Sequence, residues 1–351
     1  MVLNSTEQII HSNRADEIYA AVICFTLSVF GIITNGAAIV VIIAAKNLQN
    51  AFGYSCMSHA VGDLGVLIIF AIWIPLQLIL TPETIPQFLQ NKRLAYTIGQ
   101  ATIIFYYGAI YTHVLIGLNR YVAIAKPFSY AIYFNERKTM KWITLIWIIS
   151  FIQSCIYQFD GCHYYFDRSA MLFLYSDAPC AQIISLYYEF YFNLAFVIFV
   201  VLLDIITFFK LKKMAKPIHG FQQVIRRRRA QEIRYFIQSV CSETALILTF
   251  LCFWSVAIHA TTPFSMFLLN IGAWLTMHAA DGFIMTAFNH HIFTHIKKSA
   301  KRASLPMVTI ALSATNKRTH NQALSAQKRW LHMYHESKLK PNKIEPSRIN
   351  A

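Results

Sequence analysis

Charged residues are scarce in this sequence. Asp, Glu, Lys and Arg make up 13% of its 351 residues, whereas about 25% is usual in soluble domains. Apolar residues make up 56% of the chain, and phenylalanine alone occupies 27 positions. This shortage of charge excludes an ordinary soluble protein. The composition instead indicates a protein that crosses a membrane several times.

Several familiar sequence patterns are also missing. The chain has no HExxH, GxSxG or P-loop pattern, which argues against a membrane hydrolase or a nucleotide-driven enzyme. It has no internal repeat of about 20–50 residues and no two similar halves, which disfavours a transporter built from inverted repeats. Residues 1–18 are polar and do not resemble a cleavable signal sequence. We therefore expect no enzymatic activity, no cofactor and no metal site.

Seven long apolar segments follow one another along the chain. A helix rises about 1.5 Å per residue, so a segment of about 20 residues can cross a hydrocarbon core about 30 Å thick. The segments cover residues 19–45, 55–80, 94–124, 142–159, 183–209, 235–258 and 264–288. The sequence thus predicts an all-α membrane protein whose seven-transmembrane helix bundle lies within residues 19–298. Residues 1–18 and the basic, polar residues 299–351 are expected to form tails, the second largely disordered.

A stretch rich in histidine follows the last apolar segment directly. It contains His290, His291 and His295, next to Lys297 and Lys298. Such a group could suggest a metal site, but its place at the end of a membrane span favours a short amphipathic helix at the interface.

Basic residues gather in alternate links between the segments. If the amino terminus lies outside, the inner links and the carboxyl-terminal tail hold 26 of the 31 Lys and Arg residues, and the outer pieces hold four. This asymmetry predicts a multi-pass protein of the cell membrane with an extracellular amino terminus and a cytoplasmic carboxyl terminus. The basic excess then reflects orientation and attraction to anionic lipid, with no nucleic-acid partner. On the outer side, Asn4 fits a glycosylation acceptor pattern.

Two cysteines share one outer loop. Cys162 and Cys180 both lie between the fourth and fifth segments, on the side of the membrane where thiols are oxidised. We predict a disulfide bond between them, which stabilises the loop by about 3 kcal/mol on a chain-entropy argument. The alternative is a pair of free thiols. The other five cysteines lie in or near the apolar segments and are expected to be packing residues.

Two ionisable residues within the apolar segments stand out. Arg120 lies near the inner end of the third segment, and Glu189 lies near the start of the fifth. A charge costs about 2.5–3.5 kcal/mol at the centre of a bilayer, so Arg120 is expected in a protein-lined or interfacial site. The alternative for Arg120 is a side chain that extends to the interface and only anchors the helix end. Glu189 calls for a hydrogen-bonding partner or a cationic ligand.

The ends of the third and seventh segments carry a family resemblance. Seven segments, Asn119-Arg120-Tyr121 at the inner end of the third, and a basic third inner link resemble the rhodopsin-like G-protein-coupled receptors. The stretches NRYVAIAKP, GCHYYFD followed by SDAPC, and AFNHHI resemble more narrowly the nematode serpentine chemoreceptors of class x. The resemblance implies a chemosensory receptor that binds an external small molecule in the outer half of the bundle and signals to a cytoplasmic heterotrimeric G protein.

The resemblance also implies a switch at the inner end of the bundle. Asn119, Arg120 and Tyr121 take the place of the family's acid, arginine and aromatic residue. Because Asn119 replaces the acid, an ionic latch needs another carboxylate, and Glu232 and Glu243 around the inner end of the sixth segment are the candidates. Arginine suits such a latch because its guanidinium stays charged and donates to several oxygens at once.

A polar network near mid-membrane is a second implied site. Asn35, Asp63 and Asp281 occupy positions where rhodopsin-like receptors carry polar residues. His278 lies one helical turn before Asp281, so the two can pair. Two buried carboxylates cannot both ionise cheaply, so they would share a proton or hold a cation. The alternative is a satisfied network that only joins the helices.

The third implied site is a ligand pocket in the outer half of the bundle. Its predicted lining residues are Thr102, Tyr106, Tyr107, Glu189, Trp254 and Trp274. For each aromatic residue the alternative is plain packing between helices.

A seven-span transporter or channel for a small solute is the alternative function. Its polar path is not apparent, because the polar residues within the apolar segments are few and do not line one continuous face. The sequence makes no prediction about dimers, the ligand's identity or the G-protein subtype.

Overall fold

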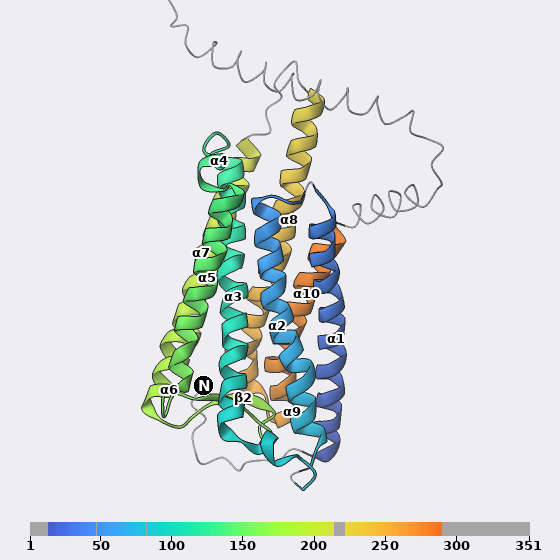
Figure 1. Ribbon diagram of the computed structural model, residues 1–351, viewed down its shortest axis with the longest axis vertical. Helices are drawn as coiled ribbons and strands as arrows, with labels where there is room; N and C mark the ends of the chain where they lie inside the picture. The colour runs from blue at the N-terminus through green and yellow to red at the C-terminus, as the bar shows by residue number, and fades with distance from the viewer. Residues whose placement is uncertain (1–12, 47, 82, 214–221, 290–351) are drawn as a thin grey trace, which may run out of the picture. The chain divides into compact units, whose positions relative to one another are not determined.

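The computed structural model describes residues 13–46, 48–81, 83–213 and 222–289, and of residues 222–229 only the backbone. The glycosylation candidate Asn4, the predicted amphipathic helix after residue 289 and the predicted tail 299–351 lie outside the described residues. The described chain forms a bundle of long, roughly parallel helices, with a two-stranded hairpin across one end (Figure 1).

Helices account for almost all of the described chain. The long helices are α1 (Arg14–Ala44), α2 (Ala51–Ile79), α3 (Lys92–Ala125), α5 (Glu136–Ser154), α7 (Asn193–Lys213), α8 (Gln222–Leu251) and α10 (Ala273–Phe288). Short helical turns extend several of them: η2 (Cys155–Gln158) follows α5, α6 (Pro179–Ile183) and η3 (Ile184–Phe192) precede α7, η4 (Cys252–Val256) and η5 (Ala257–His259) follow α8, and α9 (Pro263–Phe267) and η6 (Leu268–Gly272) precede α10. The links contain η1 (Gln87–Gln90), α4 (Tyr130–Tyr133) and the antiparallel strands β1 (Tyr164–Asp167) and β2 (Leu172–Tyr175), which form the hairpin.

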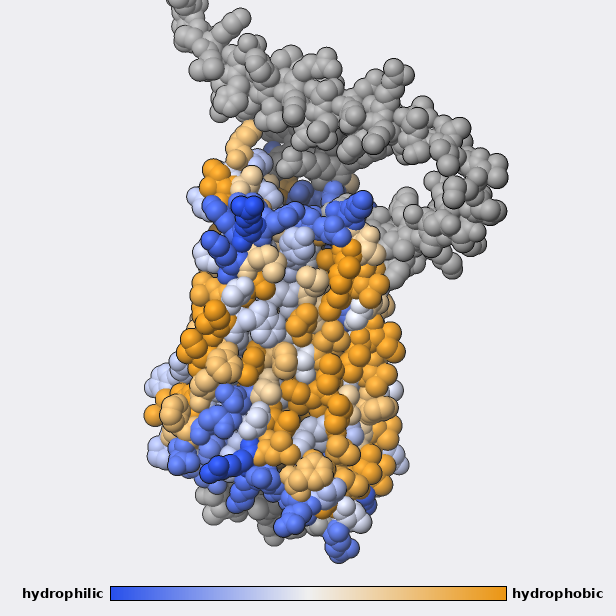
Figure 2. All heavy atoms as spheres, in the orientation of Figure 1, coloured by the Kyte–Doolittle hydropathy of each residue, from blue (hydrophilic) through white to orange (hydrophobic). Residues whose placement is uncertain are grey.

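The bundle has the dimensions and the surface of a membrane protein. Among the described residues, six helices are long and apolar enough to cross a membrane. The seventh predicted crossing, from α9 to α10, is also helical. Asn270, His278 and Asp281 make it more polar than the other six. Figure 2 shows apolar side chains in a band around the middle of the bundle, between polar side chains at its two ends. The architecture is therefore that predicted from the seven apolar segments.

Four of the long helices begin directly after an asparagine. Asn13, Asn50, Asn91 and Asn135 precede α1, α2, α3 and α5, and each side-chain oxygen accepts a hydrogen bond from a backbone N–H of the first turn. This capping satisfies a donor that the first turn otherwise leaves free. The capping residues lie in the polar links, so the helices begin before the predicted apolar segments. For example, α5 begins at Glu136 rather than at residue 142.

The helices are packed unequally. Of the most apolar stretch of each helix, 61% is buried in α2 and 67% in α3, but only 17% in the crossing formed by α5 and η2. Close approach is possible where side chains are small. A Cβ atom on Gly282 of α10 would lie 2.5 Å from the Asn35 amide nitrogen of α1, so glycine lets these two helices meet. Helices α1, α2, α3 and α10 thus form the densest part of the bundle.

Candidate functional site

Three of the residues predicted for the switch, Asn119, Arg120 and Glu232, meet at the end of α3 opposite the hairpin. Arg120 is only 2% exposed, and its Nη1 donates to Glu232 Oε2 on α8 at 2.8 Å. Its Nη2 donates to the side-chain oxygen of Asn119. The guanidinium carbon lies 4.0 Å from the ring centre of Phe52 and 5.1 Å from that of Tyr235, an arrangement that stabilises a cation. Arg120 therefore joins α3 to α2 and α8.

The two candidate latch acids have different surroundings. Glu232 contacts Arg120, whereas Glu243 lies eleven residues further along α8, about 16 Å away at 1.5 Å per residue. Glu243 faces Asp204 of α7 instead, so its predicted pairing with Arg120 is not found. Tyr121 is half-buried and, within the described part of the chain, makes no hydrogen bond with this group.

The polar network forms at mid-bundle, but with a different pairing from the one predicted. His278 does not pair with Asp281 on its own helix; its Nδ1 lies 2.7 Å from Asp63 Oδ1 on α2. Asn35 donates to the backbone oxygen of His278 at 3.0 Å. Both His278 and Asp63 are fully buried. The His278 side chain reaches across the helix interface to α2, and so it meets Asp63 instead of Asp281 on its own helix.

Sequence reasoning missed a further member of this network, His59 of α2. Its Nε2 lies 3.6 Å from Asp63 Oδ2 and 3.4 Å from Asp281 Oδ2. The sequence does contain a signal for it: His59 precedes Asp63 by four residues, so the two share one face of a helix. His59 and Asp63 are one helical turn apart, as are His278 and Asp281. The spacing that singled out His278 therefore also singles out His59.

Glu189 lies in a cage of phenol groups toward the hairpin end. Its Oε1 accepts hydrogen bonds from Tyr157 at 2.6 Å and from Tyr107 at 3.2 Å. Asn193 donates to its Oε2 at 3.3 Å, and Tyr106 in turn donates to Asn193 at 3.3 Å. The residues come from α3, η2, η3 and α7. The structure thus brings together three predicted pocket residues, Tyr106, Tyr107 and Glu189, around one buried carboxylate.

Trp274 joins this group through Tyr106, whereas two other predicted residues do not. The Trp274 and Tyr106 rings meet edge to face, 5.3 Å apart. Thr102 is buried, but its hydroxyl donates to the backbone oxygen of Ile98 on its own helix. Trp254 packs against Phe190 at 4.7 Å. The predicted pocket residues that the structure brings together therefore come from α3, η3 and α10, and Trp254 of η4 does not join them.

The hairpin inserts aromatic side chains above this group. Phe173 of β2 stacks on Phe70 of α2 at 5.5 Å and meets Trp274 at 6.4 Å. Burial raises the pKa of Tyr164 and Tyr175 well above the ordinary range, and the nearby Glu189 carboxylate adds to the effect. Both phenols therefore keep their protons and remain hydrogen-bond donors at neutral pH. Sequence reasoning missed the hairpin's contacts with this group, because no spacing in the loop indicates that it folds inward.

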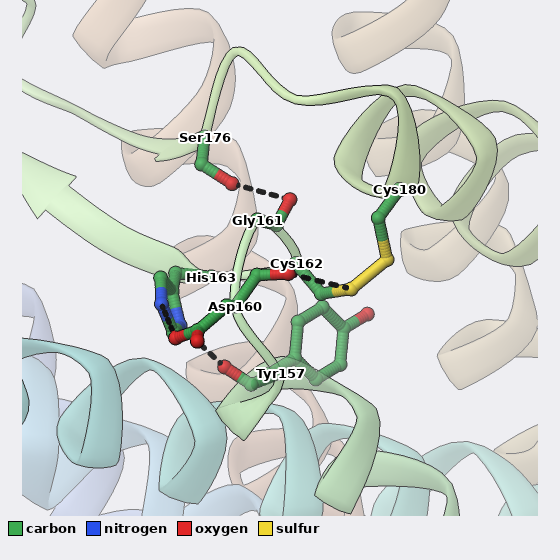
Figure 3. Close-up of a disulfide and its surroundings, with 7 residues drawn as sticks. All are labelled: Tyr157, Asp160, Gly161, Cys162, His163, Ser176 and Cys180. Carbon is green, nitrogen blue, oxygen red and sulfur yellow. Dashed lines mark hydrogen bonds and ion pairs between the residues drawn. A yellow bond between two sulfur atoms is a disulfide. The ribbon is translucent and has the colours of Figure 1, made fainter.

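The predicted disulfide bond is present at the base of the hairpin. Cys162 and Cys180 are bonded, with their Cα atoms 5.2 Å apart. Figure 3 shows Cys180 at the start of a helix and Cys162 in the segment before β1. Ser176 donates to the Gly161 backbone oxygen at 2.7 Å beside it. The bond ties the hairpin to α6 and so fixes the position of the hairpin relative to the helix that carries Glu189.

An ion pair holds the other end of the hairpin. Arg168, in the turn between β1 and β2, donates to both carboxylate oxygens of Glu17 on α1, at 3.1 and 2.7 Å. Arg168 also donates to the backbone oxygens of Leu78, in the last turn of α2, and of Leu80, directly after it. Arg14 contacts the same carboxylate at 2.9 Å. The sequence showed Arg168 only as one of four outer basic residues and gave no sign of its partner.

Comparison with known proteins defines first the class and then the family. The structure resembles the crystal structure of squid rhodopsin, with a TM-score of 0.68 over 91% of this chain and 95% of that chain, at 14% identity. The fold is thus the seven-helix fold of squid rhodopsin, and the predicted seven-helix bundle is confirmed. The family described as serpentine type 7TM GPCR chemoreceptor Srx matches residues 25–289. The chain belongs to this family, which confirms the resemblance found in the sequence.

A curated relative supports the same assignment. The chain is 25% identical to serpentine receptor class X 45 of Caenorhabditis elegans over 328 residues, which cover 88% of this chain and 89% of that protein. The family is one of receptors rather than of enzymes. The chain is accordingly a multi-pass membrane receptor of the serpentine class.

Proposed function

We propose that this receptor is a chemosensory G-protein-coupled receptor, with an external small molecule as ligand and a heterotrimeric G protein as partner. The observation that carries the proposal is the contact of Arg120 with Glu232, at 2.8 Å. It links α3 to α8 at the end of the bundle opposite the hairpin, and it keeps Arg120 almost fully buried. A movement of α8 away from α3 would break the pair and expose the guanidinium to a cytoplasmic protein.

The proposed orientation has the hairpin outside and the Arg120 end in the cytosol. The links on the Arg120 side hold one, four and nine Lys and Arg residues, and the tail after residue 288 holds twelve, whereas the hairpin side holds four. Basic residues in short links favour the cytoplasmic side. The disulfide bond between Cys162 and Cys180 at the hairpin end supports the same direction, because disulfide bonds persist in oxidising compartments.

The proposed ligand site is the group of side chains under the hairpin. Glu189 offers a buried carboxylate whose contacts come from phenols and an amide rather than from a cation. The Trp274 indole N–H is buried and has no hydrogen-bond partner among the described residues. A buried donor without a partner costs about 1–3 kcal/mol, and a ligand acceptor could recover this free energy. The site therefore favours a small, partly aromatic ligand with a donor or cationic group for Glu189 and an acceptor for Trp274.

The test is a screen of soluble and volatile chemicals against cells that express the receptor, with nucleotide exchange on a panel of G proteins as the readout. We expect ligand-dependent exchange that Arg120→Ala abolishes at equal surface expression. Arg137→Ala is the matched control, because Arg137 is an exposed arginine beside the same end of the bundle. Solute uptake or current without nucleotide exchange would overturn the proposal in favour of a transporter or channel.

A second variant tests the ligand site separately from coupling. Glu189→Gln keeps the shape of the side chain and removes its charge. We expect it to weaken the response to a cationic ligand at least tenfold and to leave basal nucleotide exchange unchanged. An unchanged response would remove Glu189 from the ligand site without affecting the proposed coupling through Arg120.

A further inference from the structure

A groove runs between α1 and α2 on the surface of the bundle, toward the hairpin end. The two helices lie side by side (Figure 1). The groove has a volume of about 510 Å³, and every side chain that lines it is apolar. This volume falls in the range of small-molecule sites, about 300–1,000 Å³. The groove belongs to the face that lipid chains would cover, apart from the group of side chains around Glu189.

Small side chains make the floor of the groove, and large ones make its walls. Ala21 of α1 is fully buried, and Ala71 and Pro75 of α2 continue the floor. Val22 and Ile72 rise on either side, and both are exposed. A continuous exposed apolar surface of this shape marks a site for an apolar partner. A larger side chain at Ala71 would fill the floor.

The groove is about as long as one leaflet of a bilayer is deep. Its lining residues on α2 run from Ala71 to Leu80, so its length is about 13 Å at 1.5 Å per residue. Half of a hydrocarbon core about 30 Å thick is about 15 Å. The groove starts at the end of α2 and stops about half-way through the core. It therefore suits a chain that enters from the hairpin side and ends at the middle of the bilayer.

A partly exposed arginine stands at the open end of the groove. The Arg14 side chain is 44% exposed, and its Nη1 donates to Glu17 at 2.9 Å and to the Leu78 backbone oxygen at 2.6 Å. Its Nη2 donates to the backbone oxygen of Ile79, whose side chain lines the groove. A guanidinium has five N–H donors, and these contacts within the described chain use three. The Nε donor and a second Nη2 donor remain for a further acceptor.

The side chains around Arg14 favour an anionic acceptor. Arg14 and Arg168 share the carboxylate of Glu17, at 2.9 and 2.7 Å. Two guanidiniums and one carboxylate leave one positive charge among these three side chains. Asp16 lies two positions after Arg14 and so lies on another face of α1. The open end of the groove therefore combines an apolar channel with a cation that has two N–H donors to offer.

We propose that the groove binds one phospholipid of the leaflet on the hairpin side, with an acyl chain between α1 and α2 and the phosphate at Arg14. Arginine can donate to two phosphate oxygens at once in a planar arrangement. A sterol also fits an apolar channel, but its single hydroxyl does not use both donors or balance the charge. Tyr19 is exposed on α1 between Arg14 and Val22, at the depth of the interface where tyrosines are common.

The test uses the full-length receptor in detergent, and native mass spectrometry counts the lipid molecules that stay bound. The probes are phosphatidylcholine, the diacylglycerol with the same two chains but no phosphate, and cholesterol. We expect one phosphatidylcholine per receptor, bound at least about tenfold more tightly than the diacylglycerol. Equal binding of these two lipids would overturn the role of Arg14. Tighter binding of cholesterol would overturn the choice of a phospholipid.

Two variants test whether the lipid lies in this groove. Arg14→Gln removes the cation, and Ala71→Leu fills the floor, so each should weaken phosphatidylcholine at least about tenfold. The matched controls are Arg93→Gln, at an exposed arginine of the hairpin end, and Ala195→Leu, at an exposed alanine of α7. Both controls should bind as the wild type does. Unchanged binding in Arg14→Gln and Ala71→Leu, or an equal loss in the controls, would overturn the proposal.

A second measurement keeps the proposal testable if a variant folds poorly. Phosphatidylcholine with a photoreactive group on one acyl chain is cross-linked to the wild-type receptor in lipid nanodiscs, and the labelled residues are identified. We expect Val22, Phe25 and Ile72 to be labelled at least about fivefold more than Ile152 of α5. Ile152 is 64% exposed and Ile72 is 57% exposed, so lipid that merely surrounds the bundle would label both alike. That result would overturn the proposal.

Discussion

Each end of the bundle is closed by an arginine–glutamate pair, and the two pairs differ in how they are supported. At the hairpin end Arg168 donates twice to Glu17 and also to two backbone oxygens at the end of α2. The Cys162–Cys180 bond holds the other side of the hairpin. At the opposite end a single hydrogen bond joins Arg120 to Glu232, between two aromatic rings.

The difference indicates which end moves. The hairpin can leave the bundle only if several bonds break together, and the covalent bond limits how far it can go. Helix α8 can separate from α3 when one ion pair breaks, and Glu232 is already 22% exposed in its side chain. We therefore expect a stable closure over the proposed ligand site and a switch at the Arg120 end. Matched changes at the two ends can test this asymmetry.

The largest effect is expected from loss of the disulfide bond. Cys162→Ser removes a cross-link over a sequence separation of 18 residues, worth about 3 kcal/mol by the chain-entropy argument. Hydrogen exchange of the β1 and β2 amides should become roughly 100-fold faster, because the hairpin opens more often. Cys155→Ser is the control, since Cys155 is a free cysteine just before the same loop. Equal exchange in the two variants would show that the bond does not hold the hairpin.

Charge reversal at the Arg120 end should come next in size. Glu232→Lys replaces the carboxylate that pairs with a buried arginine, and after a discount for the exposure of Glu232 the resting state should lose about 2 kcal/mol. If the proposed function is right, basal nucleotide exchange then rises. The ratio of resting to active receptor should fall roughly 30-fold. The hairpin amides should exchange as in the wild type.

Two control variants test whether loss of the Arg120–Glu232 pair causes the rise in basal exchange. Glu136→Lys makes the same charge change at an exposed position near the same end of the bundle and should leave basal exchange unchanged. Glu243→Gln tests the other latch candidate, which faces Asp204 instead of Arg120, and should not reproduce the rise. If Glu243→Gln raised basal exchange and Glu232→Lys did not, the latch would have to be reassigned to the α7–α8 contact.

The sequence was most informative where a residue had few alternatives. A polar residue in an apolar helix must find a partner inside the bundle, so Arg120, Asp63, Asp281 and Glu189 stand out from the amino-acid order alone. Two cysteines in one loop, on the side predicted to be oxidising, had only each other. The apolar segments located every helix crossing, and only the ends differed, because asparagine caps in the polar links extend the helices.

The sequence was least informative about which partner each residue meets. His278 could pair along its helix with Asp281 or across it with Asp63, and the rotation of α10 against α2 decides between them. Arg168 and Glu17 are 151 positions apart, so their contact depends on how the hairpin folds inward. Glu232 and Glu243 both looked suitable for Arg120, and only the position of α8 along α3 distinguishes them.

The smallest expected effect comes from the Arg168–Glu17 ion pair over the proposed ligand site. Arg168→Ala removes the bonds to Glu17, but the disulfide bond and the packing of Phe173 remain. The Arg168 side chain is 24% exposed, so solvent screens the pair and the loss should be about 1 kcal/mol. Exchange of the hairpin amides should rise roughly fivefold, and basal nucleotide exchange should not change. Arg93→Ala, at an exposed arginine near the start of α3, is the control. A rise in basal exchange as large as that of Glu232→Lys would mean that the two ends are coupled, and that the weakly held Arg120 end is not an independent switch.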